Sequence, residues 1–486
     1  MLKAHKDIYD AVIIGAGISG LICGCYLAKA GMKVLIAEQH FKPGGYCTSF
    51  KRSGFTFDAA AHSFGGYREN GIVKKVFVEL GIDERVQINR FDPSDIITAP
   101  DCEVSFWANV DDTVRDFQKA FPGESNNIRV FFNFLIENNP QSFARLRNWT
   151  FKNLLDEYIK NDKLKSILSF PLLGNGGLPP SRMSAFIGAR LFIEFLLDGG
   201  YYPKGGMQEL PNILATRFKE LGGTLRLSSL VTKIVIDDNT VKGVMLEKEG
   251  VIPSEYVISN CDARQTFLKL LGKEKLSQEF LEKLSNMTPS LSMFVLYLGI
   301  DKNCRTLPKV GSNIWHMPHY DIEKMYVSAN LRNISNVAEY MVRVSPDGQT
   351  VLAFINAAFH DTTYWNRHKI NFLDVLIKHI ERQTIPGLSE HIQYKDAATP
   401  YTMYRYTMNE EGAAYGWAST PTQFADPDFR RPSCMKGLFL TGHWATQGMG
   451  IPGVAYLGYD MANYILKKKD TSYQLNKEIV CKKRNT

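Results

Sequence analysis

Three glycines near the start of the chain have the spacing that dinucleotide binding requires. Gly15, Gly17 and Gly20 form the pattern G-x-G-x-x-G within DAVIIGAGISGLICGCYLAKAGMKVLIAE. Gly15 permits a tight turn, Gly17 lets the backbone approach a pyrophosphate, and Gly20 lets a helix pack closely on a strand. The phosphate would then lie at a helix N-terminus, where free N–H groups and the helix dipole favour negative charge.

A carboxylate follows the glycines at the distance expected for a ribose contact. Glu38 ends the second apolar run of this stretch, where a carboxylate can accept hydrogen bonds from a ribose 2′-OH. Because an acidic residue repels a 2′-phosphate, NADP is disfavoured at this site. Gly44 and Gly45, in KPGGYCTSF, suit a backbone that passes close to an extended dinucleotide. FAD and NAD both remain open on these residues alone.

Regular elements must hold these residues in place. An apolar run at 11–14, an apolar helical pattern and a second apolar run at 33–37 predict a β-α-β unit. Later patterns predict an amphipathic helix at 210–221 and strands at 231–236, 241–246, 256–259 and 438–441. Two more runs, SMFVLYLGI and TVLAFINAAF, have the character of strands in a second sheet. The fold is therefore predicted to be α/β.

Four stretches of the chain carry a family resemblance. The N-terminal glycine region resembles the FAD motif of the glutathione-reductase-like flavoproteins and, more narrowly, the phytoene desaturase, carotenoid isomerase and retinol saturase group. The segments YPKGG (202–206), TPYTMYR (399–405) and GHWATQG (442–448) resemble further motifs of that group. The resemblance implies a Rossmann-type FAD-binding domain at 1–80, 200–262 and 430–486. An inserted α+β substrate-binding domain would occupy 81–199 and 263–429.

The same resemblance implies a set of site residues. The expected cofactor-binding residues are Gly15, Gly17, Ser19, Gly20, Glu38, Gly44, Gly45, Val231, Gly442, Gly448, Met449, Gly450 and Ile451. The candidate catalytic residues are His62, Tyr404 and Arg405, and Tyr415 is expected near the cavity. A histidine could deliver or accept a proton because its pKa lies near neutrality. His62 could equally be a hydrogen-bonding core residue.

Aromatic residues in the predicted helical insertion have two interpretations. Because they recur at helical spacing, they fit a plain hydrophobic core, whereas the family resemblance suggests an apolar tunnel. The candidates for the tunnel are Phe131, Phe132, Phe134, Phe186, Phe192 and Phe195.

The resemblance implies an activity. The chain is expected to be an FAD-dependent oxidoreductase or isomerase that acts on C=C bonds of a long apolar polyene or isoprenoid. The segments around His62 and TPYTMYR look more like the saturase and isomerase branch, which favours reduction or isomerisation over desaturation. Two alternatives remain: an amine-oxidase-type flavoenzyme, and a non-enzymatic lipid-escort protein of the kind represented by GDP-dissociation inhibitors, which do not use FAD.

Composition bounds the partners and the location. The chain has 486 residues, 44% of them hydrophobic, and a net charge of +7, so it is long enough for two domains and only mildly basic. No apolar signal-like region precedes the first strand and no run of 18 apolar residues occurs. We expect a cytoplasmic protein without a nucleic-acid partner and with at most peripheral membrane contact. That contact would use basic residues of the tail, namely Lys467, Lys468, Lys469, Lys482, Lys483 and Arg484.

Metal binding is not expected. The eight cysteines lack the spacing of metal ligands and fit reduced thiols. His316 and His319 lie three residues apart, but Pro318 between them argues against a shared helix and no third ligand is close in sequence.

Overall fold

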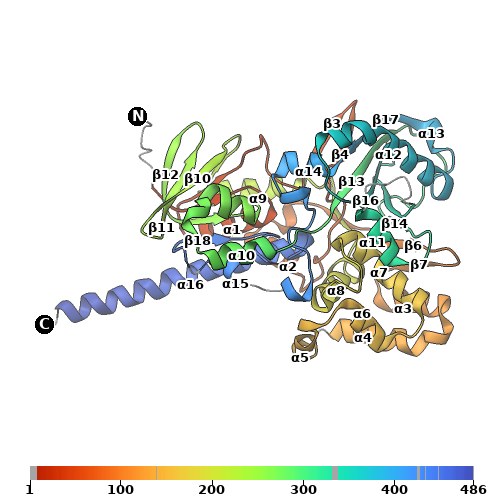
Figure 1. Ribbon diagram of the computed structural model, residues 1–486, viewed down its shortest axis with the longest axis horizontal. Coiled ribbons are helices and arrows are strands. Elements are labelled where there is room, and N and C mark those ends of the chain that lie inside the picture. The colour runs from red at the N-terminus through yellow and green to blue at the C-terminus, as the bar shows by residue number, and fades with distance from the viewer. Residues whose placement is uncertain are drawn as a thin grey trace.

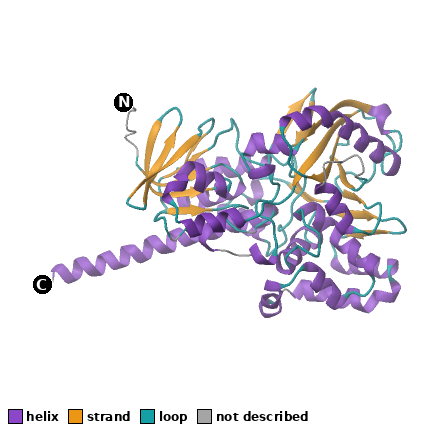
Figure 2. Cartoon of the chain, viewed as in Figure 1, coloured by secondary structure: helices purple, strands orange, loops and turns teal. Residues whose placement is uncertain are grey.

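The computed structural model describes residues 8–137, 139–330, 338–423, 427–432, 434–446 and 448–484. Side chains are described up to Lys469, so Lys482, Lys483 and Arg484 of the predicted basic tail lie outside the described side chains. Two sheets lie on opposite sides of the molecule (Figures 1 and 2), and a long C-terminal helix extends away from them.

The first sheet joins both ends of the chain. Its order is β10-β11-β12-β1-β2-β9, and β18 pairs with the end of β12 on the edge opposite β1. Strands β2, β1, β12 and β18 are parallel, and β10 and β11 add an antiparallel hairpin. The strands are β1 (Tyr9–Ile14), β2 (Val34–Ala37), β9 (Thr224–Arg226), β10 (Val231–Asp237), β11 (Thr240–Leu246), β12 (Gly250–Ser259) and β18 (Leu438–Leu440). This sheet confirms the predicted Rossmann-type arrangement.

Helices α1 (Ile18–Lys29) and α16 (Gly450–Arg484) pack together beside this sheet; α2 (Ile72–Leu80) packs on both of them, and α9 (Glu209–Glu220) packs on α1. Gly20 allows the close approach that the sequence predicted, because a Cβ there would overlap the carbonyl oxygen of Gly15. Ile18 to Ala28 are all buried. A helix apolar on every side is buried between other elements, and α1 is therefore the centre of this half of the molecule.

The second sheet is built from two separate segments. Its order is β17-β13-β16-β15-β14-β6-β7. The predicted strands in SMFVLYLGI and TVLAFINAAF are the antiparallel neighbours β13 and β16. The strands are β6 (Asp95–Thr98), β7 (Glu103–Phe106), β13 (Ser292–Ile300), β14 (Asn313–His316), β15 (Tyr340–Val344), β16 (Thr350–Ala357) and β17 (Ile392–Ala398).

Helices cover both faces of the second sheet. One face carries α12 (Thr362–Gln383), whose buried residues share a core with β13, β15 and β16. The other face meets a helical cluster visible below it in Figure 1. That cluster comprises α3 (Val110–Ala120), α4 (Ser125–Glu137), α5 (Pro140–Ala144), α6 (Phe151–Tyr158), α7 (Asp162–Gly176), α8 (Ala185–Leu191) and a π-helix (Phe192–Leu197).

Shorter elements connect the two sheets and the helices that pack on them. They include β3 (Ser49–Arg52), β4 (Phe55–Asp58), β5 (Ile88–Arg90), β8 (Tyr201–Pro203), α10 (Gln278–Asn286), α11 (Ile322–Asn330), α13 (Leu388–His391), α14 (Pro400–Thr407), α15 (Pro427–Arg430) and a second π-helix (Gln265–Gly272). His316 ends strand β14 and His319 follows it in a turn, so the two histidines do not share a helix.

Three properties of the described residues concern metals, thiols and membranes. No three His, Cys, Asp or Glu side chains among them converge as metal ligands would. The seven cysteines whose side chains are described are free thiols. Within the same part of the chain, no helix combines the length and the apolar character needed to span a bilayer.

Candidate active site

A large cavity lies between the two sheets. It contains about 1850 Å³ of space not filled by atoms, part of it open to solvent. The first sheet and its loops contribute Ile14, Gly15, Gly17, Ser19, Glu38, Gly44, Gly45, Val231, Asn260, Gly442 and Ile451. The opposite wall includes Asp95, Phe195, Met293, Asn313, Phe354, Met403 and Tyr415.

The glycine motif forms a cradle for a phosphate. Gly15 has φ +97, a conformation that favours glycine, and Gly17 is the residue before helix α1. No side chain caps this end of the helix, so its first N–H groups can donate to an anion. The Gly44 amide donates to the Ala16 carbonyl at 2.9 Å, which places the second glycine pair against the first motif. These features fit the pyrophosphate of FAD.

Glu38 is fixed against the same loop. Its Oε2 accepts from the Ala16 amide at 2.7 Å, and its Oε1 accepts from the His40 amide at 2.9 Å. The side chain lies on the cavity wall. A carboxylate has about four acceptor positions, so both oxygens keep lone pairs for a ribose. The geometry fits the nucleotide contact predicted from the sequence.

The C-terminal segment closes the cradle from the other side. The hydroxyls of Ser19 and Thr441 are hydrogen-bonded at 2.7 Å, which joins helix α1 to the end of strand β18. Gly442 follows with φ +81, and a Cβ there would overlap the Asn260 amide oxygen. Gly450 and Ile451, at the start of α16, line the cavity. Residues from opposite ends of the chain therefore form one wall.

Three predicted cofactor-binding residues lie behind this wall and do not line the cavity. Gly20 packs on Gly15, as described above. A Cβ at Gly448 would overlap the side chain of Leu457 on the next turns of α16. Met449 is 4% exposed, and its sulfur accepts from the Ser419 hydroxyl at 3.6 Å. The structure shows packing contacts for these three residues, and their expected contact with the cofactor stays a prediction.

The YPKGG segment and the two residues after it hold the loop that carries Gly44 and Gly45. The Tyr202 hydroxyl donates to Asp58 at 2.7 Å, and the Met207 amide donates to the same carboxylate at 3.0 Å. Gln208 donates to the Pro43 carbonyl at 2.9 Å, directly before Gly44. The segment thus positions the loop that lines the cavity.

His62 lies on the cavity wall as a neutral imidazole. Its Nδ1 donates to the Ala60 carbonyl at 3.2 Å, and its ring faces Phe354 with ring centres 5.5 Å apart. Burial, and secondarily the positive charge of Arg343, lowers the pKa of His62 to about 3. With Nδ1 protonated, Nε2 carries the lone pair. Near neutral pH His62 can therefore accept a hydrogen bond at Nε2, whereas both acid and base catalysis there would involve an imidazolium that burial disfavours.

A Gln substitution at His62 should change how stability depends on pH. The folded state keeps this imidazole neutral, while the unfolded chain protonates it near pH 6.5. Stability of the wild-type chain is therefore lost as pH falls below 6.5, by up to about 1.4 kcal/mol per pH unit from this residue. Between pH 7 and pH 5, the unfolding free energy of His62→Gln should rise relative to wild type by about 2 kcal/mol.

Urea unfolding at the two pH values measures this difference. His443→Gln should move in the same direction, because burial lowers the pKa of His443 to about 4. Parallel pH profiles for wild type and His62→Gln would contradict the neutral state assigned to His62.

Helix α14 presents a different face to the cavity from the one expected. Met403, Tyr406 and Thr407 line the cavity, but Tyr404 and Arg405 do not. Arg405 is exposed, and the Tyr404 ring packs edge-on against Phe359 at 5.8 Å. Tyr404 and Arg405 are therefore not among the described residues that line the cavity, and the catalytic role expected for them stays a prediction. Tyr415 does line the cavity, and its hydroxyl donates to the Gly174 carbonyl at 2.7 Å.

Most of the predicted tunnel phenylalanines belong to the hydrophobic core. Phe131, Phe132 and Phe192 are fully buried and pack on one another with ring centres 5.7–5.9 Å apart. Phe134 and Phe186 pack against the same core. Of the six, Phe195 lines the cavity. The core interpretation of this pattern is confirmed for the other five.

Sequence reasoning missed several cavity residues. His443 follows Gly442 directly, and Asn260 follows strand β12 at the edge where parallel strands end, which is a position that often binds ligands. Asn409 accepts from the Trp444 indole at 2.9 Å and donates to the Tyr46 hydroxyl at 3.1 Å. The positions of His443 and Asn260 next to predicted strand ends were a usable signal, whereas nothing local marked Asn409.

A buried polar pair on the second sheet was also missed. Asp95 is 2% exposed, and its Oδ1 accepts from the Trp315 indole at 2.8 Å and from the Asn313 amide at 2.9 Å. Burial raises the pKa of Asp95. Both Asp95 and Asn313 line the cavity, so the substrate side is not entirely apolar.

Comparison with known proteins places the chain among flavoenzymes. A family model for flavin containing amine oxidoreductases matches residues 18–466. The chain is 24% identical to all-trans-retinol 13,14-reductase from Danio rerio, covering 90% of this chain and 83% of that protein. It is 26% identical to phytoene desaturase (lycopene-forming) from Pseudescherichia vulneris, over 91% and 96%. Identity to the chloroplastic prolycopene isomerase of Arabidopsis thaliana is 25%, over 95% and 83%.

A similar fold occurs in solved structures. A double mutant of putrescine oxidase, made in a redesign of cofactor binding, superposes with a TM-score of 0.65 at 14% identity. The match covers 95% of this chain and 99% of that one. At this identity the likeness concerns the fold.

Proposed function

Because the chain belongs to the family of flavin containing amine oxidoreductases, we propose that it acts on C=C bonds of a long apolar polyene or isoprenoid, as an FAD-dependent oxidoreductase or isomerase. The observation that carries this proposal is the cavity that elements of both sheets line. Its first wall has the glycine cradle, and its second wall carries Phe195, Met293, Phe354 and Met403. A carotenoid- or retinoid-type substrate would lie against that second wall.

We assign the cofactor-holding role to the predicted residues that line the cavity. These are Gly15, Gly17, Ser19, Glu38, Gly44, Gly45, Val231, Gly442, Gly450 and Ile451. The division into an FAD-binding part (1–80, 200–262 and 430–486) and a substrate-binding part (81–199 and 263–429) is part of the same proposal. The positions of the strands support this division. Every strand of the first sheet lies in the proposed FAD-binding part, and every strand of the second sheet lies in the proposed substrate-binding part.

When bound, FAD supplies hydride exchange with a substrate carbon at its N5 atom. The chain's own residues do the rest. The apolar second wall excludes water and holds the polyene in register. His62 can accept a hydrogen bond at Nε2, and its ring is held in orientation by the Nδ1 hydrogen bond to the Ala60 carbonyl. Charged side chains of Lys or Arg are not among the described residues that line the cavity, so substrate binding there does not rest on an ion pair with a cation.

The direction of the reaction can be tested directly. We propose reduction or isomerisation rather than desaturation. The purified enzyme would be photoreduced and incubated with C20 and C40 polyenes, and the products would be analysed by mass. A gain of two mass units or an unchanged mass with altered geometry supports the proposal, and a loss of two contradicts it. Parallel incubation with small amines tests amine oxidation, and a native protein without flavin absorbance would support the lipid-escort alternative.

We further propose that membrane contact, where it occurs, is peripheral and electrostatic. Lys467, Lys468 and Lys469 lie near the end of the described side chains, and basic residues are attracted to anionic headgroups at about 1 kcal/mol each. The protein should pellet with vesicles containing anionic lipid at low salt and be released at high salt. Equal pelleting with neutral vesicles would contradict this mode of contact.

A further inference from the structure

Phe195 is held over the start of the C-terminal helix. It lies in the π-helix at 192–197, and a Cβ at Gly450 would overlap its ring. Gly450 is the first residue of α16 and has φ +63. A π-helix carries an extra residue per turn, so it turns side chains away from the directions an α-helix would give, and such turns are frequent at functional sites. Here the result is an aromatic ring on the cavity wall.

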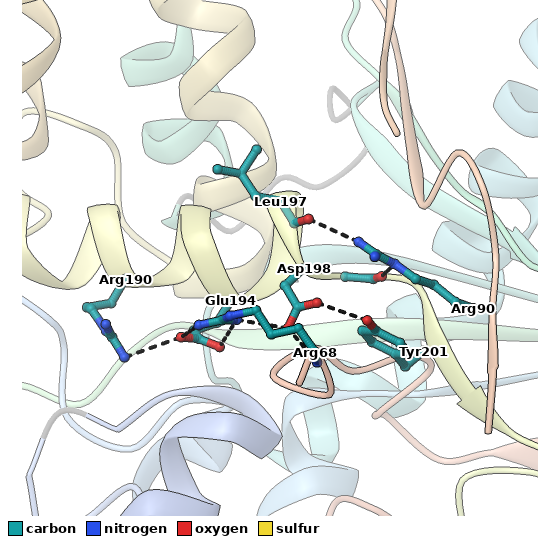
Figure 3. Close-up of polar contacts among 8 residues, drawn as sticks. Arg68, Arg90, Arg190, Glu194, Leu197, Asp198 and Tyr201 are labelled. Atoms are coloured by element: carbon teal, nitrogen blue, oxygen red, sulfur yellow. Dashed lines mark hydrogen bonds and ion pairs between the residues drawn. The ribbon is translucent and has the colours of Figure 1, made fainter. Parts of the chain in front are cut away.

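An arginine from the first half of the molecule clamps this π-helix (Figure 3). Arg68 Nη2 and Nη1 donate to the two oxygens of Glu194, each at 2.9 Å. Arg68 Nη1 also donates to Asp198 Oδ2 at 2.8 Å. Glu194 is 7% exposed and Asp198 is 4% exposed. The two carboxylates lie on either side of Phe195 in sequence, so their shared partner fixes both ends of its turn.

The backbone just before Arg68 packs closely against the π-helix and against α16. A Cβ at Gly65 would overlap the Glu194 carbonyl oxygen, and a Cβ at Gly66 would lie 3.0 Å from Cβ of Pro452 in α16. The segment 65–68 is therefore wedged between the π-helix and the beginning of α16. This wedge links the position of the π-helix to the segment that closes the cofactor cradle.

A second set of contacts holds the end of the turn. Arg90 Nη2 donates to the Leu197 carbonyl at 3.0 Å and its Nε donates to the Gly199 carbonyl at 3.2 Å. The Tyr201 hydroxyl donates to Asp198 Oδ1 at 3.0 Å. Figure 3 shows these groups on the far side of Asp198 from Arg68. Asp198 is thus held from two directions, whereas the Glu194 end depends on Arg68 and on Arg190, at 3.2 Å.

We propose that Phe195 is a specificity-determining residue that contacts the apolar substrate, and that Arg68 positions it through Glu194 and Asp198. This inference rests on the proposed function, since it assigns the substrate a contact on the same cavity. Phe195 is the part of the aromatic helical region that reaches the cavity, and its ring offers an apolar face beside the start of α16. A polyene packed there gains contact area and aromatic stacking.

A double-mutant cycle tests the coupling. The variants are Phe195→Ala, Arg68→Lys and the double variant, and Arg68→Lys keeps the charge while losing the two-pronged geometry. We expect KM for the polyene to rise about tenfold in Phe195→Ala, the size of a typical important contact, with a smaller change in kcat. Arg68→Lys should raise KM less than Phe195→Ala does. If Arg68 acts through Phe195, Arg68→Lys should have no further effect in the Phe195→Ala background.

Arg85→Lys is the matched control. Arg85 forms a similar pair with Glu220, at 2.7 Å to each oxygen, on the protein surface. It should leave KM unchanged. An equal rise in KM on adding Arg68→Lys to wild type and to Phe195→Ala would overturn the positioning role, as would a lowered melting temperature without any change in KM.

A readout without substrate separates this inference from the proposed function. The visible absorbance bands of bound flavin should shift in Phe195→Ala and Arg68→Lys, and the double variant should match Phe195→Ala. Absence of turnover with every polyene would overturn the proposed function and the substrate contact of Phe195. Additive shifts of the flavin bands in an enzyme that does turn over polyenes would overturn the positioning role alone.

Discussion

A Gly17→Val protein is expected to fold and to be colourless. Gly17 has φ −69 and ψ 169, which any residue adopts, so valine introduces no backbone strain. A Cβ there would lie 2.9 Å from the Asn260 amide nitrogen and would enter the cradle in front of helix α1. Two or more lost phosphate hydrogen bonds, each worth about 1.5–3 kcal/mol, should weaken FAD binding at least ~100-fold.

Flavin absorbance of the purified protein and titration of the apoprotein with FAD measure this effect. Gly123→Val is the matched control, because a Cβ at Gly123 meets no atom within 4 Å. It should retain the full flavin content. A yellow Gly17→Val protein with wild-type affinity would show that the dinucleotide does not pass over this glycine.

Removal of the Arg68 guanidinium should cost about 3 kcal/mol of unfolding free energy. In Arg68→Met, the carboxylates of Glu194 and Asp198 lose their main partner while remaining buried. Breaking a buried pair costs about 3–5 kcal/mol, and the low end applies because the Arg68 side chain is 37% exposed. The Glu194 hydrogen bonds, more than the opposing burial, raise the pKa of Arg68, so the native guanidinium stays charged.

Equilibrium urea unfolding of the holoprotein measures the loss. Arg85→Met removes the exposed pair with Glu220 and should cost much less unfolding free energy, because solvent screens that pair. A loss as small as that of Arg85→Met would mean that water or Arg190 compensates the two carboxylates.

Local sequence signals predicted the elements well. The strand expected at 33–37 is Val34–Ala37, and the helix expected at 210–221 is Glu209–Glu220. Apolar periodicity and glycine at a turn are properties of a few neighbouring residues, so they survive whatever the rest of the chain does. The contacts of Glu38 with the glycine loop were predictable for the same reason, since both belong to one β-α-β unit.

The second wall of the cavity could not be predicted in the same way. The choice between Tyr404 and Tyr406 on α14 depends on how the helix is rotated against β13 and β17, which no local pattern encodes. Phe192 and Phe195 differ by three residues, yet one is core and the other lines the cavity, because the π-helix breaks the 3.6-residue periodicity. Asp95 and Asn313 are 218 residues apart and meet only through the pairing of β6 with β14.

The pairing of β18 with β12 has a consequence for biosynthesis. Strand β18 (Leu438–Leu440) must emerge from the ribosome before it can pair with β12. Gly442 and Gly450, which complete the cavity wall, emerge later still. The residues before Leu438 can form their own helices and the second sheet, but they contain only the N-terminal part of the nucleotide cradle. Such long-range closure makes assembly slow and leaves apolar edges open during translation, so chaperone demand should end only when the last segment arrives.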